Sequence, residues 1–171
     1  MNLISVWEDK YYATDKGCHN YIKYYNEWFE EYQDKEINLL EVGVENGYSV
    51  RLWKAYFTKA IIYGMDHLKH YGCEFHGDST NKEEVDKLLG DLKFDIIIDD
   101  GDHHPESQIK TYNNLKNRLN DEGMYVIEDI HGPKYKNYIY EKQVNKIKSL
   151  GFEIIDTEGE FNCSYLGIIR T

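Results

Sequence analysis

Apolar and polar residues follow two different rhythms along the chain. Between His19 and Gln33 the aromatic side chains recur at every third or fourth position, which is the spacing of one face of an α-helix. From Ile37 onward short apolar runs alternate with polar segments of helical length, a pattern typical of βαβ units and of a parallel sheet covered on both faces. The pattern predicts strands at 37–42, 60–65, 73–77, 94–99, 123–128, 152–156 and 163–169. It predicts helices at 19–33, 47–58, 81–90, 106–119 and 137–150.

The connections between these elements define the expected topology. The last two predicted strands are joined by too few residues for a crossover helix, so they should pair antiparallel. Ser79 or Thr80 should cap the helix at 81–90. We therefore expect an α/β fold with a seven-stranded, mostly parallel sheet whose last strand is antiparallel. Because no repeat or linker divides the chain, we expect one domain over 1–171, with an N-terminal helical cap at 1–35 and a Rossmann-like core at 36–171.

Composition narrows the partners and the compartment. The formal net charge of −11 repels phosphate backbones and anionic lipids, so neither nucleic acid nor a membrane is an expected partner. The three cysteines form no CxxC pair and the first residues lack a secretion signal, which favours a reducing, cytoplasmic location. No apolar run approaches the ~20 residues of a membrane helix. The sixteen tyrosines indicate an ordered chain and leave both a monomer and a homo-oligomer open.

Acidic residues gather at the ends of five successive predicted strands. Ligands of open α/β sheets bind at these carboxyl ends, so the acids mark a candidate site. Helix caps and exposed loop charges are the alternative explanation. The residues concerned are Glu41, Asp66, Asp78, the pair Asp99 and Asp100, and the pair Glu128 and Asp129.

The turn after the first strand favours a cationic ligand. Gly43 and Gly47 permit a tight turn and close approach of a ligand to the backbone. Glu41 and Glu45 flank the turn and would repel the pyrophosphate of a dinucleotide such as NAD. S-adenosylmethionine (SAM) carries an ammonium and a sulfonium but no phosphate, so the same acids would attract it. The turn therefore favours SAM over NAD, and a methyltransferase over a nicotinamide-dependent oxidoreductase.

Further acids complete the expected cofactor pocket. Asp66 follows Gly43 by 23 residues, close to the ~20-residue offset at which an acidic side chain meets the ribose hydroxyls in dinucleotide-binding folds. Asp78 ends the third strand region, where it would meet the adenine amino group, and we include Asp99 in the same pocket.

A second acidic group predicts a metal site. Asp100, Glu128 and Asp129 follow neighbouring strands and can converge on one point, where they offer only oxygen ligands. Such a site favours Mg²⁺, with Mn²⁺ or Ca²⁺ as alternatives, and zinc is disfavoured because no cysteine is near. The cation would bind an acceptor hydroxyl, lower its pKa and hold it in line with the sulfonium methyl.

A histidine beside this acidic group is the expected general base. His103 follows Asp100 by three residues, and an unperturbed histidine pKa near 6.5 suits proton transfer around neutral pH. His104 and His131 are rivals for that role. Each histidine alone is more often a surface or structural residue than a base.

These segments resemble the metal-dependent class I SAM O-methyltransferases, most of all the family that methylates the sugars of macrolide antibiotics. The catechol-type O-methyltransferases are also similar. The resemblance implies a class I methyltransferase sandwich, SAM and Mg²⁺ as cofactors, and a small hydroxylated acceptor. It also implies that Asp100, Glu128 and Asp129 hold the Mg²⁺ and that His103 deprotonates the acceptor. The matching segments are Thr14–Gly17 with His19 and Tyr21, then Leu39–Trp53, Phe94–His104 and Gly123–Asp129.

The same resemblance assigns contacts to the cofactor and exposes two departures. Asp102 replaces the usual small residue and would add charge beside the metal, while His131-Gly132-Pro133 replaces an aromatic stretch. The remaining alternatives are a SAM-binding regulatory module without efficient catalysis and, less favoured, an NAD-dependent oxidoreductase. The implied contacts are Glu41 and Gly43 with the methionine part, Tyr48 and Ser49 with its carboxylate end, Asp66 with the ribose, and Thr14–Gly17 with His19 closing over the cofactor or acceptor.

Overall fold

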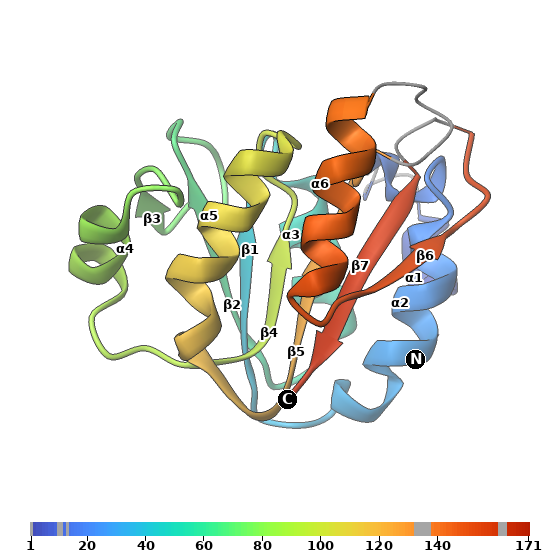
Figure 1. The fold of residues 1–171 in the computed structure, drawn as a ribbon. Helices are drawn as coiled ribbons and strands as arrows, with labels where there is room; N and C mark the ends of the chain where they lie inside the picture. Colours follow the sequence, from blue (N-terminus) through green and yellow to red (C-terminus); the bar gives the residue numbers. More distant parts are fainter. Residues whose placement is uncertain (1, 10–11, 13, 132–137, 161–163) are drawn as a thin grey trace.

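The structure is a computed structural model that describes residues 2–9, 12, 14–131, 138–160 and 164–171. A seven-stranded sheet forms the centre, with α5 and α6 on its near face and α3 on the far face in Figure 1. The strands are β1 (Asn38–Val42), β2 (Ile61–Asp66), β3 (Phe75–His76), β4 (Phe94–Asp99), β5 (Leu119–Ile127), β6 (Glu153–Asp156) and β7 (Tyr165–Arg170). The helices are α1 (Leu3–Trp7), α2 (Tyr21–Phe29), α3 (Tyr48–Tyr56), α4 (Lys82–Leu89), α5 (Pro105–Leu115) and α6 (Tyr138–Ser149). Among the described residues, short 3₁₀ helices are η2 (Asp15–Gly17), η3 (Glu30–Tyr32) and η4 (Lys116–Arg118).

The strand order confirms the predicted topology. The order is β3-β2-β1-β4-β5-β7-β6. Strands β1 to β5 pair parallel, whereas β7 pairs antiparallel with both β5 and β6. The direction of winding reverses between β1 and β4, and open α/β sheets bind ligands beyond the carboxyl ends of the strands at such a point. The turns that follow β1 and β4 are therefore the expected position of a ligand site.

The N-terminal region differs most from the predicted elements. Neither α1 nor η2 is predicted, because helices of five and three residues are too short to show an apolar period. The helix predicted at 19–33 begins only at Tyr21, since Asn20 has a left-handed backbone with φ of 59°. It ends at Phe29 and continues as the 3₁₀ turn η3.

Several other boundaries shift by a few residues. The predicted caps Ser79 and Thr80 are wrong, because the side chain of Asn81 accepts the backbone N–H groups of the first turn of α4. Strand β3 is confined to two residues, and β5 begins at Leu119 rather than at 123. Residues 137 and 163, which the predictions place in a helix and a strand, lie outside the described residues.

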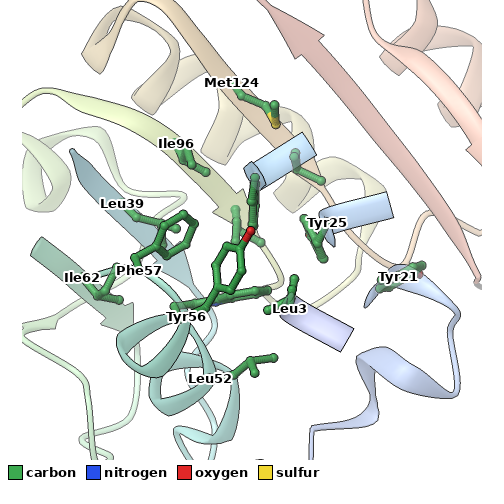
Figure 2. Packing of buried hydrophobic residues seen from close by; sticks show 14 of the residues in the cluster. Leu3, Tyr21, Tyr25, Leu39, Leu52, Tyr56, Phe57, Ile62, Ile96 and Met124 are labelled. Atoms are coloured by element: carbon green, nitrogen blue, oxygen red, sulfur yellow. The ribbon is translucent and has the colours of Figure 1, made fainter. Parts of the chain in front are cut away.

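The core consists of two apolar clusters, one on each face of the sheet. Successive side chains of a strand point to opposite faces, so Leu39 packs with the α1–α3 side and Leu40 with the α4–α6 side. Figure 2 shows Leu3, Tyr25 of α2 and Leu52 of α3 among the labelled residues of the first cluster. The aromatic face of α2 is thus core, which ties the N-terminal region to the sheet. No described helix combines the length and apolarity that crossing a bilayer requires.

Candidate active site

A cavity of about 680 Å³ opens at the carboxyl ends of β1, β2 and β4, where the winding reverses. This volume suits a cofactor-sized ligand. Eight predicted site residues line the cavity: Gly43, Tyr48, Ser49, Asp66, Asp78, Asp99, Asp100 and His103. The other four predicted site residues, Glu41, Gly47, Glu128 and Asp129, are not among the lining residues.

The two glycines of the first turn are required by close backbone contacts. Gly43 has φ of 83°, and a Cβ atom there would lie 1.8 Å from the carbonyl oxygen of Asp100. Gly47 has φ of 71°, and a Cβ atom would lie 2.4 Å from the carbonyl oxygen of Tyr71. Side chains other than hydrogen would therefore be strained at both positions. Gly43 allows the β1 turn to rest directly on the acidic end of β4.

Asp66 organises the turn that borders the cavity. Its Oδ2 accepts the backbone N–H groups of Val44 at 2.8 Å and Glu45 at 3.1 Å, and its Oδ1 accepts that of Leu68 at 2.8 Å. Burial raises the pKa of this carboxyl, but the backbone hydrogen bonds outweigh burial and hold the pKa below its usual value. Asp66 is therefore a carboxylate that joins the ends of β1 and β2.

The side chain of Glu41 lies behind the cavity and points toward α3. It is fully buried, and its Oε2 accepts the Ser49 hydroxyl at 2.9 Å and the Trp53 indole N–H at 3.2 Å. Burial raises its pKa to about 7, although the nearby Lys16 opposes the shift. Glu41 is expected to line the methionine pocket, but it is not among the residues that line the cavity, because alternation along β1 turns its side chain toward α3.

A buried lysine, which the sequence analysis includes only as part of the Thr14–Gly17 segment, stands at the centre of the acids. Lys16 is 1% exposed, and its Nζ lies 2.6 Å from Asp100 Oδ2, 2.8 Å from both oxygens of Glu128 and 3.4 Å from Glu41 Oε1. Burial would lower its pKa, but attraction by Asp100, Glu128 and Glu41 raises it well above the usual value. An excess of acids at buried strand ends is the signal that calls for such an internal cation.

The rest of the Thr14–Tyr25 segment holds the acids at the end of β5. The Tyr25 hydroxyl donates to Glu128 Oε1 at 2.6 Å, and the Tyr21 hydroxyl donates to Asp129 Oδ1 at 2.8 Å. His19 Nδ1 lies 3.1 Å from the same Asp129 oxygen. This segment therefore binds the acids on the side away from the cavity. The sequence analysis expects Thr14–Gly17 and His19 to close over the cofactor or acceptor. Of these residues, Thr14 and Asp15 line the cavity.

Three side chains form a candidate metal site, which we call the outer site because Glu128 stands behind it. Asp100, His103 and Asp129 each place one ligand atom within 4.8 Å of the others. His103 Nε2 lies 3.3 Å from Asp100 Oδ1, and His103 Nδ1 lies 3.3 Å from Asp129 Oδ2. The carboxylate oxygens of Asp100 and Asp129 are ligands of the kind that Mg²⁺ and Mn²⁺ prefer. Glu128 stands behind this outer site, since both of its oxygens face Lys16 or Tyr25.

His103 is the histidine that meets both the cavity and the outer site. Its backbone is left-handed with φ of 57°, which turns the ring back between the two carboxylates. Burial lowers its pKa, but the hydrogen bond to Asp100 and the charge of Asp129 dominate and raise the pKa to about 9. In this arrangement the ring is protonated at neutral pH and pairs with the two acids.

The remaining predicted residues are less central. Asp99 is 2% exposed and lines the cavity, and burial raises its pKa to about 8. Asp78 is exposed and accepts the backbone N–H and hydroxyl of Thr80. Asp102 accepts the backbone N–H of His104 and the hydroxyl of Ser107, so it stabilises the turn that precedes α5.

Two rivals for the base and one overlooked residue complete the site. His104 is the residue before α5 and is exposed, and the pKa of His131 is lowered by burial. Gly132 and Pro133, the other part of the predicted departure, lie outside the described residues.

Gln108 of α5 was not predicted, yet it lines the cavity, and its Nε2 donates to the Glu128 carbonyl at 2.9 Å. Its buried Oε1 has no hydrogen-bond partner among the described residues.

The sequence of this chain is similar to those of known methyltransferases. No model of a known protein family matches the sequence. The chain is 30% identical over 136 residues to 8-demethyl-8-alpha-L-rhamnosyl tetracenomycin-C 2'-O-methyltransferase of Streptomyces olivaceus, a match that covers 70% of this chain and 35% of the relative. It is 28% identical over 142 residues to mycinamicin VI 2''-O-methyltransferase of Micromonospora griseorubida, covering 74% of this chain and 36% of the relative. The chain thus spans about one third of the length of these relatives.

The fold of this chain is also similar to those of solved structures. The MycE methyltransferase of the mycinamycin biosynthetic pathway, solved with Mg, SAH and mycinamycin VI, has a TM-score of 0.76 at 26% identity, covering 88% of this chain and 45% of its own. The Methanococcus jannaschii fibrillarin pre-rRNA processing protein has a TM-score of 0.58 at 18% identity, covering 80% of this chain and 67% of its own, and shares the fold alone. The strand order, the cavity and these matches define a class I SAM methyltransferase fold. Within that class, the chain is a homologue of the macrolide-sugar O-methyltransferases.

Proposed function

We propose that this domain transfers the methyl group of SAM to a hydroxyl of a small acceptor, with a sugar or glycoside as the first candidate. The observation that carries the proposal is that Asp100 and His103 belong both to the cavity and to the outer acidic site. Methyl transfer to oxygen needs a donor methyl and an activated hydroxyl held in line. The relatives are named as sugar-directed O-methyltransferases, and MycE was solved with Mg and SAH, which supports both cofactors.

The residues around the cavity would hold SAM by charge and by backbone approach. Of the two acids expected to attract the ammonium and sulfonium, Glu45 is exposed and lines the cavity, so it takes this role rather than Glu41. The β1 turn around Gly43 admits the ligand close to the backbone. Asp66 stands at the end of β2 for the ribose, and Gln108 Oε1 offers a buried acceptor for an N–H or O–H of the ligand.

The outer site would supply the activation of the acceptor. Asp100 and Asp129 would hold Mg²⁺ or Mn²⁺, and Glu128 stands directly behind them. When bound, the cation lowers the pKa of the acceptor hydroxyl. His103 then acts as general base, for which it must first lose its own proton. Its protonated form is stabilised by Asp100 and Asp129, and that stabilisation would be lost when these two acids hold a cation.

We extend the proposal to the organisation and setting of the chain. Residues 1–171 would act as one methyltransferase domain, with the N-terminal helices supporting the site as a cap. A cytoplasmic location is supported by Cys18 and Cys73, which are free thiols. The net charge of −11 argues for a small acceptor rather than nucleic acid.

Calorimetry followed by turnover tests this function. We expect SAM and its demethylated product SAH to bind and NAD not to bind. With a panel of glycosides, methylated product detected by mass spectrometry should disappear with EDTA and return with Mg²⁺. Binding of NAD without SAM would instead support the oxidoreductase. Normal SAM binding with no acceptor methylated, and no effect of Asp100→Ala or His103→Ala on methylation in cells, would support a SAM-binding regulatory module.

A further inference from the structure

The carboxylates beside the cavity form two neighbouring cation positions that share Asp100. Its Oδ1 faces His103 at 3.3 Å and belongs to the outer, metal-binding position. Its Oδ2 lies 2.6 Å from Lys16 Nζ and belongs to an inner position completed by Glu128 and Glu41. The inner position is thus filled by a cation of the chain itself.

The ammonium of Lys16 is held in place by the fold. Lys16 lies in η2, where the Thr14 hydroxyl accepts its backbone N–H at 3.4 Å. The next residue, Gly17, packs so closely on Trp7 that a Cβ atom would lie 2.0 Å from the indole ring. The side chain is 1% exposed. Water therefore cannot screen the charge of Lys16 from the acids, and the ammonium acts on them at short range.

We propose that Lys16 is a resident cation that competes with the divalent cation for the carboxylate of Asp100, which both cation positions share. It acts as a positioning residue: it keeps the acids assembled while no metal is bound, and it weakens metal binding so that the ion exchanges readily. The inference rests on the proposed metal site. It follows from shared ligands, because a carboxylate that already neutralises an ammonium attracts a second cation less strongly.

Neutral and charged substitutions of Lys16 separate competition from a purely structural role. Lys16→Met and Lys16→Gln remove the positive charge, whereas Lys16→Arg retains it. Lys35→Met removes an exposed lysine paired with Glu31 on the surface and serves as the matched control. Each protein is titrated with Mn²⁺ by calorimetry in the presence of SAH, and SAH affinity is measured separately.

We expect both neutral variants to bind Mn²⁺ at least about tenfold more tightly than wild type, as removal of a buried like charge requires. Lys16→Arg and Lys35→Met should stay close to wild type. Without metal, the neutral variants should unfold at a lower temperature, and Mn²⁺ should raise their melting temperature more than that of wild type. If Lys16→Met does not fold without metal, Lys16→Gln and the Mn²⁺ dependence of its melting temperature decide.

Unchanged or weaker Mn²⁺ binding in the folded neutral variants would overturn the inference while leaving the proposed function in place. Wild-type protein that binds SAH but no Mn²⁺ would overturn the metal site itself, and the role of Lys16 with it. These two failures differ in the wild-type titration, which is measured first.

Discussion

Lys16 Nζ lies 2.6 Å from Asp100 Oδ2, although 84 residues separate the two positions in the chain. The contact joins η2 in the N-terminal region to the end of β4, where the cavity and the outer acidic site meet. Lys16, Tyr21 and Tyr25 together contact the acids at the ends of β1, β4 and β5. The N-terminal helices are therefore part of the site's framework, and the predictions below depend on it.

Asp100→Asn should remove metal binding while leaving the cofactor pocket intact. Asp100 is shared by both cation positions, so its loss should weaken Mn²⁺ binding by more than the roughly 10- to 100-fold seen for outer-shell partners. SAH affinity should fall far less than Mn²⁺ affinity, because Asp100 is one of many residues that line the cavity but one of only two carboxylates in the outer site. Calorimetry with each ligand checks both, with the exposed Asp86→Asn as control. Loss of SAH binding alone would contradict the assignment.

Asp66→Ala should damage both the turn and cofactor binding. Its carboxylate accepts three backbone N–H bonds, and hydrogen bonds to charged groups contribute about 1.5–3 kcal/mol each before relaxation. We expect a loss of roughly 2–4 kcal/mol in the free energy of unfolding and a large loss of SAH affinity. Because the folded pKa lies below the unfolded one, the stabilisation is full above the unfolded pKa and is lost as pH falls through the folded value. Urea unfolding at several pH values checks the sign, and the variant should lose this acid-side dependence.

Gly43→Ala should be far more harmful than a glycine substitution in open space. Alanine at φ of 83° is strained, and its Cβ would lie 1.8 Å from the Asp100 carbonyl oxygen, so β1 and β4 must separate. We expect destabilisation of at least about 3 kcal/mol, strain and clash combined, and loss of SAH binding. Gly90→Ala is the matched control, since φ there is also positive at 51° but nothing lies within 4 Å of the added atom. It should cost only the backbone strain, about 1–3 kcal/mol, because its φ of 51° and ψ of −122° lie in a region that favours glycine. Equal costs in chemical denaturation would refute the close contact.

His103 should titrate well above the ordinary histidine range in metal-free protein. Its folded pKa is about 9, against an unfolded value of about 6.5. Protonated His103 therefore stabilises the fold fully below pH about 6.5, and this contribution disappears as pH rises through about 9. NMR titration of labelled histidines should give a midpoint near 9, and Mg²⁺ with SAH should lower it because the acids are then neutralised. A midpoint that does not respond to Mg²⁺ would separate His103 from the metal site.

The architecture and the position of the site could be predicted from the sequence. Strand periods and short connections are local signals, so all seven strands and the antiparallel β7 were found. The acids at the strand ends also follow from the sheet, and eight of the twelve predicted site residues line the cavity.

The direction of individual side chains could not be predicted. Glu41 was placed in the pocket because it flanks the glycine turn, but strand alternation turns it toward Ser49 and Trp53. The pairing of Lys16 with the acids and the place of Gln108 in the site could not be predicted, because local patterns do not encode such pairings. Asp100 and Glu128 lie 84 and 112 residues from Lys16, and Glu128 lies 20 residues from Gln108. The short helix α1 could not be predicted, because its five residues are too few to show a full apolar period.

A crystal soaked with SAH and Mn²⁺ and measured at the manganese absorption edge tests the central claim most directly. The account predicts SAH in the cavity between Gly43 and Asp66, with an anomalous peak bound to Asp100 and Asp129 beside His103. An empty cavity, or a manganese peak away from both aspartates, would contradict it.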